Sequence, residues 1–314
     1  MKILVLEPIH DDARQLLTEA GEVIVAEHID TAYVCKAIAD ADTALTRGRG
    51  RLPRKVLQAG AKLKCVARCG VGTDNIDVQA ATELGIPVIY APGSTTMAVA
   101  EHAMMLMLSV ARRVTRFNAE VKNNHWLFRN VSGMTIELRG KTLGILGLGD
   151  IGKRIAELGQ AFGMKVLYWS RNSHDGRFKF ASREDVLRQA DVLSISLALT
   201  PETRHLLDRE AFSLIKPTAI LVNTARGEIV DETALVEALQ TGKLAGAGID
   251  VLEDEIHPDN HPLWQFENVI VTPHVAAITD VTYREMCMTT AEEVVRILRG
   301  ATPTPCLVRN PEVL

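Results

Sequence analysis

The sequence lacks the features that mark membrane proteins and nucleic-acid-binding proteins. No apolar run approaches the roughly 18 residues that a membrane-spanning helix needs, and no low-complexity tract or short-period repeat interrupts the chain. Lys and Arg number 35 against 39 Asp and Glu, so the net charge of −4 leaves no basic excess to neutralise a phosphate backbone. Neither a membrane nor nucleic acid is therefore an expected partner.

Cysteine is scarce as well. The five cysteines are an odd number, and the close pair Cys65 and Cys69 has no second pair or histidine cluster to complete a zinc site. We expect reduced thiols and no metal.

The opening "MKILVLEP" is too short for the apolar part of a signal peptide and is typical of a buried strand. We therefore expect a cytoplasmic protein.

What the sequence does contain is a regular alternation of short apolar runs and helical patterns, which is typical of a parallel α/β sheet. Runs at 2–7, 22–27, 43–47, 64–68 and 87–91 predict one small domain. A second series lies at 141–149, 165–170, 191–199, 219–224, 246–251 and 268–272. Six strands with helical crossovers are the number expected of a doubly wound dinucleotide-binding fold.

Two further segments set the expected domain bounds. Residues 97–121 contain no Gly or Pro and are apolar nearly all round in their first half, which predicts a long buried helix at the end of the first domain. Residues 281–300 predict a closing helix that returns to that domain. We expect an α/β protein of two Rossmann-like domains with the active-site cleft between them: a flavodoxin-like substrate domain, 1–98 plus 284–314, and a dinucleotide-binding domain, 99–283.

The stretch "GLGDIG" follows a predicted strand and precedes a helical pattern, which is the context that a phosphate-binding glycine loop requires. Gly147 permits the tight turn, Gly149 lets the backbone approach a pyrophosphate, and Gly152 permits close helix packing. The amides around Asp150 and Ile151 would then face the anion. The alternative is an ordinary turn between strand and helix.

The residues after the second strand of this series bear on the choice of cofactor. An NAD site usually carries an acid about 20 residues past the loop, but here Ser170 stands in its place and Arg171 follows. A guanidinium can pair with a 2′-phosphate, so NADP is favoured over NAD. The alternative is that Arg171 is solvated or stacks on adenine without selectivity.

Three polar residues follow three successive predicted strands, at the sheet edge where ligands bind. They are Arg226, Glu255 and His274. Arginine can hold a carboxylate in two hydrogen bonds, histidine can exchange a proton near neutral pH, and a glutamate can fix the histidine tautomer. Taken one at a time, Arg226 could instead pair with Glu228 or Asp231, His274 could be structural, and Glu255 could lie in a solvated acidic loop.

Several motifs in one order resemble the D-isomer-specific 2-hydroxyacid dehydrogenase family across nearly the whole chain. They are "RCGVGTDNID" (68–77), "VAEH" (99–102), "GLGDIG" (147–152), "LVNTARGEIVDE" (221–232), "AGAGIDVLEDE" (245–255) and "TPHVAA" (272–277). The resemblance implies that Arg226 binds the substrate, that His274 is the acid/base and that Glu255 is its partner. It also implies that the backbone of Val71 and Gly72 receives the substrate carboxylate.

The same resemblance places Thr224 and Asp250 against the nicotinamide side of the cofactor. The sequence departs from the family pattern at three points. Ile256 replaces the usual Pro after the catalytic Glu, Thr95 stands where Asn is common, and Ser196 stands in a stretch that lacks the usual His and Pro. The first change affects a turn, whereas the other two affect the expected cleft and the cofactor contacts.

The resemblance implies hydride transfer between a nicotinamide and C2 of a small 2-oxo or 2-hydroxy acid, such as glyoxylate or hydroxypyruvate. One alternative is a phosphoglycerate dehydrogenase-like enzyme of serine biosynthesis, although a chain ending at Leu314 leaves no room for the regulatory domain that many of those carry. An alternative from another class is a catalytically idle, nucleotide-sensing binding protein. The intact Arg, Glu and His argue against it.

Two expectations concern the substrate's far end and assembly. Arg47 and Arg68 end the third and fourth strands and are the best placed to meet a distal anionic group; alternatively, Arg49, Arg51 and Arg54 form a solvated basic face and Arg68 pairs with Asp74 or Asp77. The apolar helix 97–114 and the segment around Trp126 predict a homodimer. The alternative is that this helix is buried within its own chain.

Overall fold

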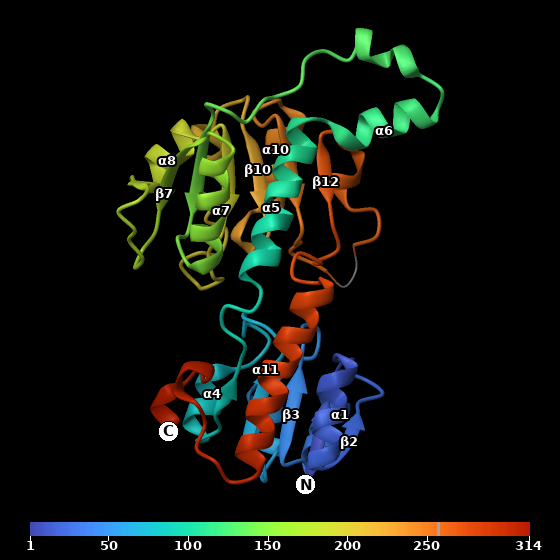
Figure 1. The fold of residues 1–314 in the computed structure, drawn as a ribbon, viewed down its shortest axis with the longest axis vertical. Helices are drawn as coiled ribbons and strands as arrows, with labels where there is room; N and C mark the ends of the chain where they lie inside the picture. Colours follow the sequence, from blue (N-terminus) through green and yellow to red (C-terminus); the bar gives the residue numbers. More distant parts are fainter. Residues whose placement is uncertain (256–257) are drawn as a thin grey trace. The chain divides into compact units, whose positions relative to one another are not determined.

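The computed structural model describes residues 1–255 and 258–314, which divide into two compact units. The first unit comprises Met1–Thr95 and Ile278–Leu314, and the second comprises Thr96–Ala277. Each has one parallel β-sheet with helices on both faces (Figure 1). The predicted α/β fold class with two Rossmann-like domains is confirmed. None of the described helices has both the length and the apolar character needed to cross a membrane.

The sheet of the first unit has the strand order β2-β1-β3-β4-β5, the flavodoxin-like order. Its strands are β1 (Lys2–Val5), β2 (Glu22–Val25), β3 (Thr43–Thr46), β4 (Cys65–Arg68) and β5 (Val88–Ile89). Its helices are α1 (Asp11–Ala20), α2 (Thr31–Ile38), α3 (Arg54–Ala59), α4 (Val78–Glu83) and α11 (Asp280–Leu298), with short 3-10 turns η4 (Pro305–Leu307) and η5 (Pro311–Val313). The predicted closing helix is thus α11, which belongs to this unit.

Alternating side chains of the strands in the first unit divide it into two cores. Ile3 and Val5 of β1 lie in the core that α1 and α11 cover, whereas Leu4 lies in the core that α2, α3 and α4 cover. Successive side chains of a strand point to opposite faces. A run in which nearly every residue is apolar, such as "KILVL", therefore fits a strand that is covered on both sides.

The sheet of the second unit has the order β12-β11-β10-β9-β6-β7-β8. Its strands are β6 (Thr142–Leu146), β7 (Lys165–Trp169), β8 (Lys179–Phe180), β9 (Val192–Ile195), β10 (Ile220–Asn223), β11 (Gly246–Ile249) and β12 (Val269–Val271). The sheet has seven strands rather than the six predicted, because β8 is a two-residue exposed edge strand without an apolar run to reveal it. Counted from β6, the order is that of a dinucleotide-binding fold with one added strand.

Helices cover both faces of this second sheet. They are α5 (Thr96–Ala111), α6 (Val114–Lys122), α7 (Asp150–Ala161), α8 (Arg183–Gln189), α9 (Arg209–Leu214) and α10 (Glu232–Gln240), with 3-10 turns η1 (Trp126–Asn130), η2 (Gly227–Ile229) and η3 (Pro262–Gln265). The core on one face includes residues of α5 and α7, and the core on the other includes residues of α8, α9 and α10.

The predicted continuous helix 97–121 is wrong. It is broken at Arg113, which has a positive φ of 53° and separates α5 from α6. The apolar residues of α5 are largely buried, whereas α6 has no buried residue, so the tertiary contacts that hold a straight helix end at Ala111. Helix α5 also belongs to the second unit rather than to the end of the first. Beyond it, α6 and η1 extend away from the sheet (Figure 1).

Candidate active site

The glycine loop joins β6 to α7 in the form that the sequence predicts. A Cβ on Gly152 would lie 2.1 Å from the carbonyl oxygen of Gly147, so only glycine permits this packing. A Cβ on Gly149 would meet nothing within 4 Å of the described chain, and its φ of −74° suits any residue. Gly149 is therefore not required by the protein's own packing, and the open space beside it suits a ligand approaching the backbone.

The start of α7 has the properties of an anion site. No described side chain caps it, whereas Asp or Ser side chains cap α2, α8, α9 and α10. Its first-turn amides belong to Asp150 and Ile151, and Asp150 is exposed. An uncapped helix start presents N–H groups and the positive end of the helix dipole. A pyrophosphate fits this end of the helix.

Two buried hydroxyl groups lie at the carboxyl ends of neighbouring strands. The hydroxyls of Ser196, after β9, and Thr224, after β10, are buried and have no hydrogen-bond partner within the described part of the chain. A buried unsatisfied hydroxyl is costly, and one common resolution is a ligand. These two atoms are therefore consistent with a nucleotide bound along this edge of the sheet, where both the Ser196 departure and the predicted Thr224 contact fall.

The predicted 2′-phosphate residues lie next to the glycine loop. The Ser170 hydroxyl accepts a hydrogen bond from the backbone N–H of Ser173 at 3.2 Å, and the Ser173 hydroxyl donates to the carbonyl of Leu148 at 2.7 Å. Nη1 of Arg171 lies 3.6 Å from Oε2 of Glu202. Arg171 thus already has an acidic neighbour with which a phosphate would compete.

Arg226, Glu255 and His274 follow β10, β11 and β12, which are adjacent in the sheet. Nδ1 of His274 lies 2.8 Å from Oε2 of Glu255, and both side chains are partly exposed. A carboxylate accepts the Nδ1–H, which leaves Nε2 available to a substrate. The structure thus gives Glu255 a specific partner instead of a merely solvated position. The departure at Ile256 lies outside the described residues.

Asn223 orders the turn that presents Arg226, a role that the sequence analysis missed. Its buried side chain donates to the carbonyl of Arg226 at 2.9 Å and accepts from the N–H of Ala225 at 3.0 Å. Nη1 of Arg226 donates to the carbonyl of Ala225 at 2.6 Å. The alternative partners have other contacts: Glu228 lies 3.8 Å from Arg204, and Asp231 caps α10.

Asp250 lies at the end of β11 with its side chain fully buried. Its carboxylate accepts the Thr272 hydroxyl at 2.6 Å and the N–H groups of Val275 and Ala276 at 3.0 and 2.9 Å. Burial raises the pKa of Asp250, but hydrogen bonds from His102, Thr272 and these amides hold that pKa below its usual value. The Asp250 carboxylate thus stays ionised inside the second unit. The resemblance to the family had placed this residue toward the cofactor.

The predicted substrate residues of the first unit gather around the ends of β3 and β4. The guanidinium of Arg47 lies over the ring of Tyr283, 5.3 Å from its centroid. Nη1 of Arg68 donates to the carbonyl of Cys69 at 2.8 Å, and a Cβ on Gly70 would lie 1.5 Å from that nitrogen. Val71 and Gly72 are partly exposed in the loop that follows.

A buried glutamate that the sequence analysis missed holds the loop of Arg47. The carboxylate of Glu7 accepts the N–H groups of four successive residues, Arg47, Gly48, Arg49 and Gly50, at 2.8–3.0 Å. Burial raises the pKa of Glu7, but these four donors outweigh burial and lower the pKa to about 2. The signal available in the sequence was only an acid directly after an apolar strand.

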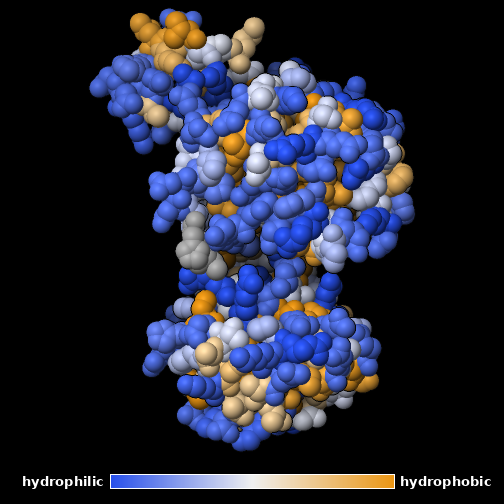
Figure 2. All heavy atoms as spheres, turned by 180° about the vertical axis from the view of Figure 1, so that it is seen from behind, coloured by the Kyte–Doolittle hydropathy of each residue, from blue (hydrophilic) through white to orange (hydrophobic). Residues whose placement is uncertain are grey.

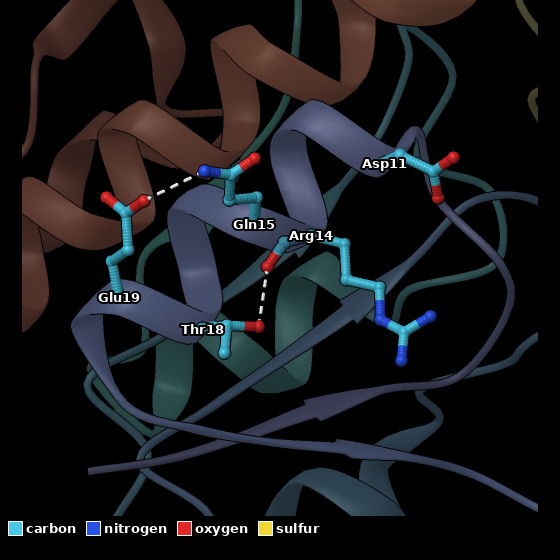
Figure 3. A pocket seen from close by; sticks show the side chains of 5 residues that line it. All are labelled: Asp11, Arg14, Gln15, Thr18 and Glu19. Atoms are coloured by element: carbon cyan, nitrogen blue, oxygen red, sulfur yellow. Dashed lines mark hydrogen bonds between the residues drawn. The ribbon is translucent and has the colours of Figure 1, made fainter.

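Other features of the surface do not add to this site. A hollow of about 340 Å³ lies on α1, lined by Asp11, Arg14, Gln15, Thr18 and Glu19. Figure 3 shows that these side chains come from one helix. The Gln15 amide donates to the carboxylate of Glu19, and the Thr18 hydroxyl donates to the backbone carbonyl of Arg14. Among residues 1–255 and 258–314, no group of three or more His, Cys, Asp or Glu is arranged to hold a metal, and all five cysteines are free thiols.

These features define a two-domain α/β protein with a dinucleotide-type glycine loop and a carboxylate-anchored histidine. The family described as "D-isomer specific 2-hydroxyacid dehydrogenase, NAD binding domain" matches residues 104–276. The chain belongs to this family. The family prediction is confirmed, and with it the class of a nicotinamide-dependent oxidoreductase of 2-hydroxy acids.

Two curated relatives and one solved structure illustrate the likeness. The chain is 46% identical over 286 residues to a glyoxylate reductase of Aeropyrum pernix, covering 88% of this chain and 84% of the relative. It is 41% identical over 306 residues to a D-3-phosphoglycerate dehydrogenase of Methanocaldococcus jannaschii, covering 96% of this chain but only 58% of that relative. An NADPH-dependent glyoxylate/hydroxypyruvate reductase from Sinorhizobium meliloti, in complex with NADP and malonate, is 32% identical with a TM-score of 0.89, each chain being covered to 96%.

Proposed function

We propose that this protein transfers a hydride between NAD(P)H and C2 of a small 2-oxo or 2-hydroxy acid, with glyoxylate and hydroxypyruvate as the first substrates to test. The observation that carries the proposal is the 2.8 Å contact between Nδ1 of His274 and Oε2 of Glu255, at a sheet edge that also carries the glycine loop. The names of the two enzymes called glyoxylate reductase and glyoxylate/hydroxypyruvate reductase support this choice.

Each of the three residues has one task in this proposal. The guanidinium of Arg226 binds the substrate carboxylate through two hydrogen bonds and keeps the carbonyl aligned. His274 holds a proton at Nε2 and gives it to the carbonyl oxygen as that oxygen becomes an alkoxide. Glu255 accepts the Nδ1–H and fixes the ring. When bound, the reduced nicotinamide supplies the hydride to C2, so one 2-oxo acid, one proton and one reduced cofactor give a 2-hydroxy acid and an oxidised cofactor.

For the cofactor, we favour NADPH. Ser170 offers no negative charge to repel a 2′-phosphate, and Arg171 offers a guanidinium to bind one. The neighbouring Glu202, 3.6 Å from Arg171, weakens this preference because a phosphate would have to displace it. A modest rather than absolute preference is expected. The backbone around Gly149, Asp150 and Ile151 would hold the pyrophosphate, with Thr224 and Asp250 toward the nicotinamide.

A phosphoglycerate dehydrogenase-like activity is the second candidate. Arg47 directly follows β3, Arg68 is the last residue of the adjacent strand β4, and Glu7 fixes the Arg47 loop. Both cations therefore lie at one edge of the sheet, beside the Val71-Gly72 loop that we expect to take the substrate carboxylate. Comparison of phosphohydroxypyruvate with hydroxypyruvate and glyoxylate, in the wild type and in an Arg47→Ala Arg68→Ala double variant, decides whether a distal anion is recognised. A charge-assisted contact predicts a tenfold to hundredfold gain, roughly, in kcat/KM for the phosphorylated substrate.

We also propose a cytoplasmic homodimer, in which the segment around Trp126, one of the two predicted contact segments, makes the contact. The expected helix is largely buried within its own unit as α5, with Met97 and Met105 46% and 40% exposed. The most exposed large apolar side chains lie beyond it, at Trp126 (66% exposed), Leu127 (65%), Val131 (80%) and Met134 (98%). Figure 2 shows apolar side chains gathered on this projecting segment. Sedimentation of the wild type and of a Trp126→Ser Leu127→Ser variant tests the dimer. A wild-type protein that sediments only as a monomer at micromolar concentration would exclude it.

A spectrophotometric screen tests the proposed activity. Glyoxylate, hydroxypyruvate, pyruvate and phosphohydroxypyruvate are offered with NADPH and with NADH, and loss of absorbance of the reduced cofactor is followed. Turnover of at least one 2-oxo acid, lost in His274→Ala, is the expected result. Tight nucleotide binding without turnover of any of them would instead favour the nucleotide-sensing binding protein.

A further inference from the structure

His102 belongs to the "VAEH" stretch, to which the proposed chemistry assigns no task. It lies in α5, with a side chain that is only 15% exposed. Its Nε2 lies 2.9 Å from the hydroxyl oxygen of Thr272 and 3.4 Å from Oδ1 of Asp250. A helix on one face of the second sheet is thus connected to the segment that carries His274.

The neighbouring hydrogen bonds fix which atom of His102 carries a proton. The Thr272 hydroxyl donates its one hydrogen to Oδ1 of Asp250 at 2.6 Å. It can therefore only accept from His102, and Nε2 must be protonated. The bonds run in one direction, from the imidazole N–H to the hydroxyl and from the hydroxyl to the carboxylate.

The carboxylate that receives this chain of bonds holds the turn around His274. It accepts the N–H groups of Val275 and Ala276, while the backbone carbonyl of Asp250 accepts the N–H of His274 at 2.8 Å. Asp250 therefore holds the main chain at His274 and at the two residues after it. Because its side chain is fully buried, water cannot replace a lost donor without rearrangement.

The turn needs such support because His274 has a φ of 53°. A left-handed conformation is uncommon for a residue with a Cβ, and it persists where the surroundings determine it. If the backbone of His274 had the ordinary helical or extended conformation, its imidazole would point Nδ1 away from Glu255. The conformation of this one residue therefore sets the proposed catalytic pair.

We propose that His102 is a positioning residue that holds the His274 turn in its left-handed conformation through Thr272 and Asp250, so that His274 meets Glu255. The effect of His102 on turnover rests on the proposed function, in which His274 is the acid/base. The restraint of residues 274–276 by His102 does not depend on that function.

The test compares variants that keep or remove the donor. His102→Phe removes the N–H, and His102→Gln retains one. Thr272→Val removes the linking hydroxyl, and Thr272→Ser retains it. His174→Phe is the control. The His174 ring packs against Phe180 of β8, which is at the opposite edge of the sheet from β12 and therefore far from the His274 turn.

Amide hydrogen exchange of Val275 and Ala276 in the full-length protein is the first measurement. Exchange is expected to accelerate about tenfold or more in His102→Phe and Thr272→Val, and to stay near the wild-type rate in His102→Gln, Thr272→Ser and His174→Phe. The second measurement is kcat, expected to fall about tenfold or more in the same two variants. The dissociation constant of the reduced cofactor should stay within about twofold of the wild type in all five, because a loss of geometry at His274 lowers the rate rather than the affinity.

Three outcomes would overturn the proposal. Unchanged exchange at Val275 and Ala276 in both His102→Phe and Thr272→Val means that His102 restrains nothing there. Failure of both donor-retaining variants to preserve slow exchange means that packing, not the donor, matters. Cofactor affinity that weakens in parallel with kcat means that His102 acts on binding. If His102→Phe does not fold, the Thr272→Val and Thr272→Ser pair decides alone. A His274→Ala variant with wild-type turnover would refute the proposed function instead, and the exchange result would still stand.

Discussion

Nδ1 of His274 and Oε2 of Glu255 lie 2.8 Å apart, although 19 positions separate the residues in the chain. The contact exists because β11 and β12 are parallel neighbours whose carboxyl ends share one edge of the sheet. The glutamate reaches His274 from the loop after β11, and His274 turns to meet it in a left-handed conformation. A histidine held by one ring nitrogen has its other nitrogen aimed in a fixed direction.

The first prediction concerns this pair. His274→Ala should lower kcat by at least about 10²-fold, the typical contribution of a general acid, and Glu255→Gln should cause a smaller loss because the amide still accepts the Nδ1–H. Steady-state kinetics measure both. His125 and Glu120 form an equally short pair at 2.8 Å elsewhere in the second unit, so His125→Ala is the matched control. Near wild-type kcat in His274→Ala would contradict the assigned chemistry.

Arg226→Lys should raise KM for the 2-oxo acid as well as lower kcat/KM, by about tenfold to a hundredfold, because an ammonium cannot reproduce the two parallel bonds of a guanidinium. Arg204→Lys serves as the control, since Arg204 is an exposed arginine whose nearest carboxylate, Glu228, is 3.8 Å away. Equal effects of the two substitutions on KM would remove Arg226 from the substrate site.

Cofactor choice should respond to the residues after β7. Ser170→Asp with Arg171→Ala should shift the ratio of kcat/KM for NADPH over NADH by about tenfold or more toward NADH, because the introduced carboxylate repels the 2′-phosphate and the guanidinium is lost. Glu202→Gln should shift the ratio the other way by removing the competing charge. Dissociation constants of 2′,5′-ADP provide a reading that does not depend on turnover. A wild-type enzyme that uses NADH better than NADPH refutes the role of Arg171.

Two glycines of the phosphate loop should differ sharply in what they tolerate. Gly149→Ala should leave the melting temperature unchanged, since nothing of the described chain lies within 4 Å of its Cβ, yet weaken cofactor binding about tenfold. Gly152→Ala should destabilise the fold itself, because its Cβ would meet the Gly147 carbonyl at 2.1 Å. Gly176→Ala, with equally open space, is the control. Thermal melts and titrations with reduced cofactor separate the two effects, and unaltered affinity in Gly149→Ala would count against a pyrophosphate there.

Glu7 should make the protein sensitive to acid. Its pKa is lowered from 4.5 to about 2, so its charged form stabilises the fold above pH 4.5 and this contribution is lost as the pH falls from 4.5 to about 2. The shift corresponds to about 3 kcal/mol of unfolding free energy at neutral pH. Glu7→Gln should lose about that amount at pH 7, and its stability should then change less than that of the wild type between pH 5 and pH 2. Urea unfolding at several pH values measures this, with exposed Glu27→Gln as the control; parallel pH curves for Glu7→Gln and wild type would refute the role.

Local pattern and spacing were enough to predict much of this protein. Apolar runs with two covered faces marked β1, β3, β9 and β10, because a parallel strand buried on both sides admits few polar residues. The glycine loop and the three residues after β10, β11 and β12 were predictable because strand ends in such a sheet face the ligand edge. The edge strand β8 was not, since two exposed residues leave no apolar signal.

The tertiary structure decided the features that depend on partners distant in sequence. The break between α5 and α6 depends on where burial of the helix stops, which no window of sequence reports. Glu7 is 40 positions from the first N–H that it accepts, and His102 is 170 positions from Thr272, so neither role has a local pattern. The sequence by itself determined the apolar strands of both sheets, their series along the chain and the residue types at their ends, but not the edge strand β8. Only packing could decide that His274 adopts a left-handed conformation and which buried polar groups hold it there, because those hydrogen bonds form between segments that the fold alone brings together.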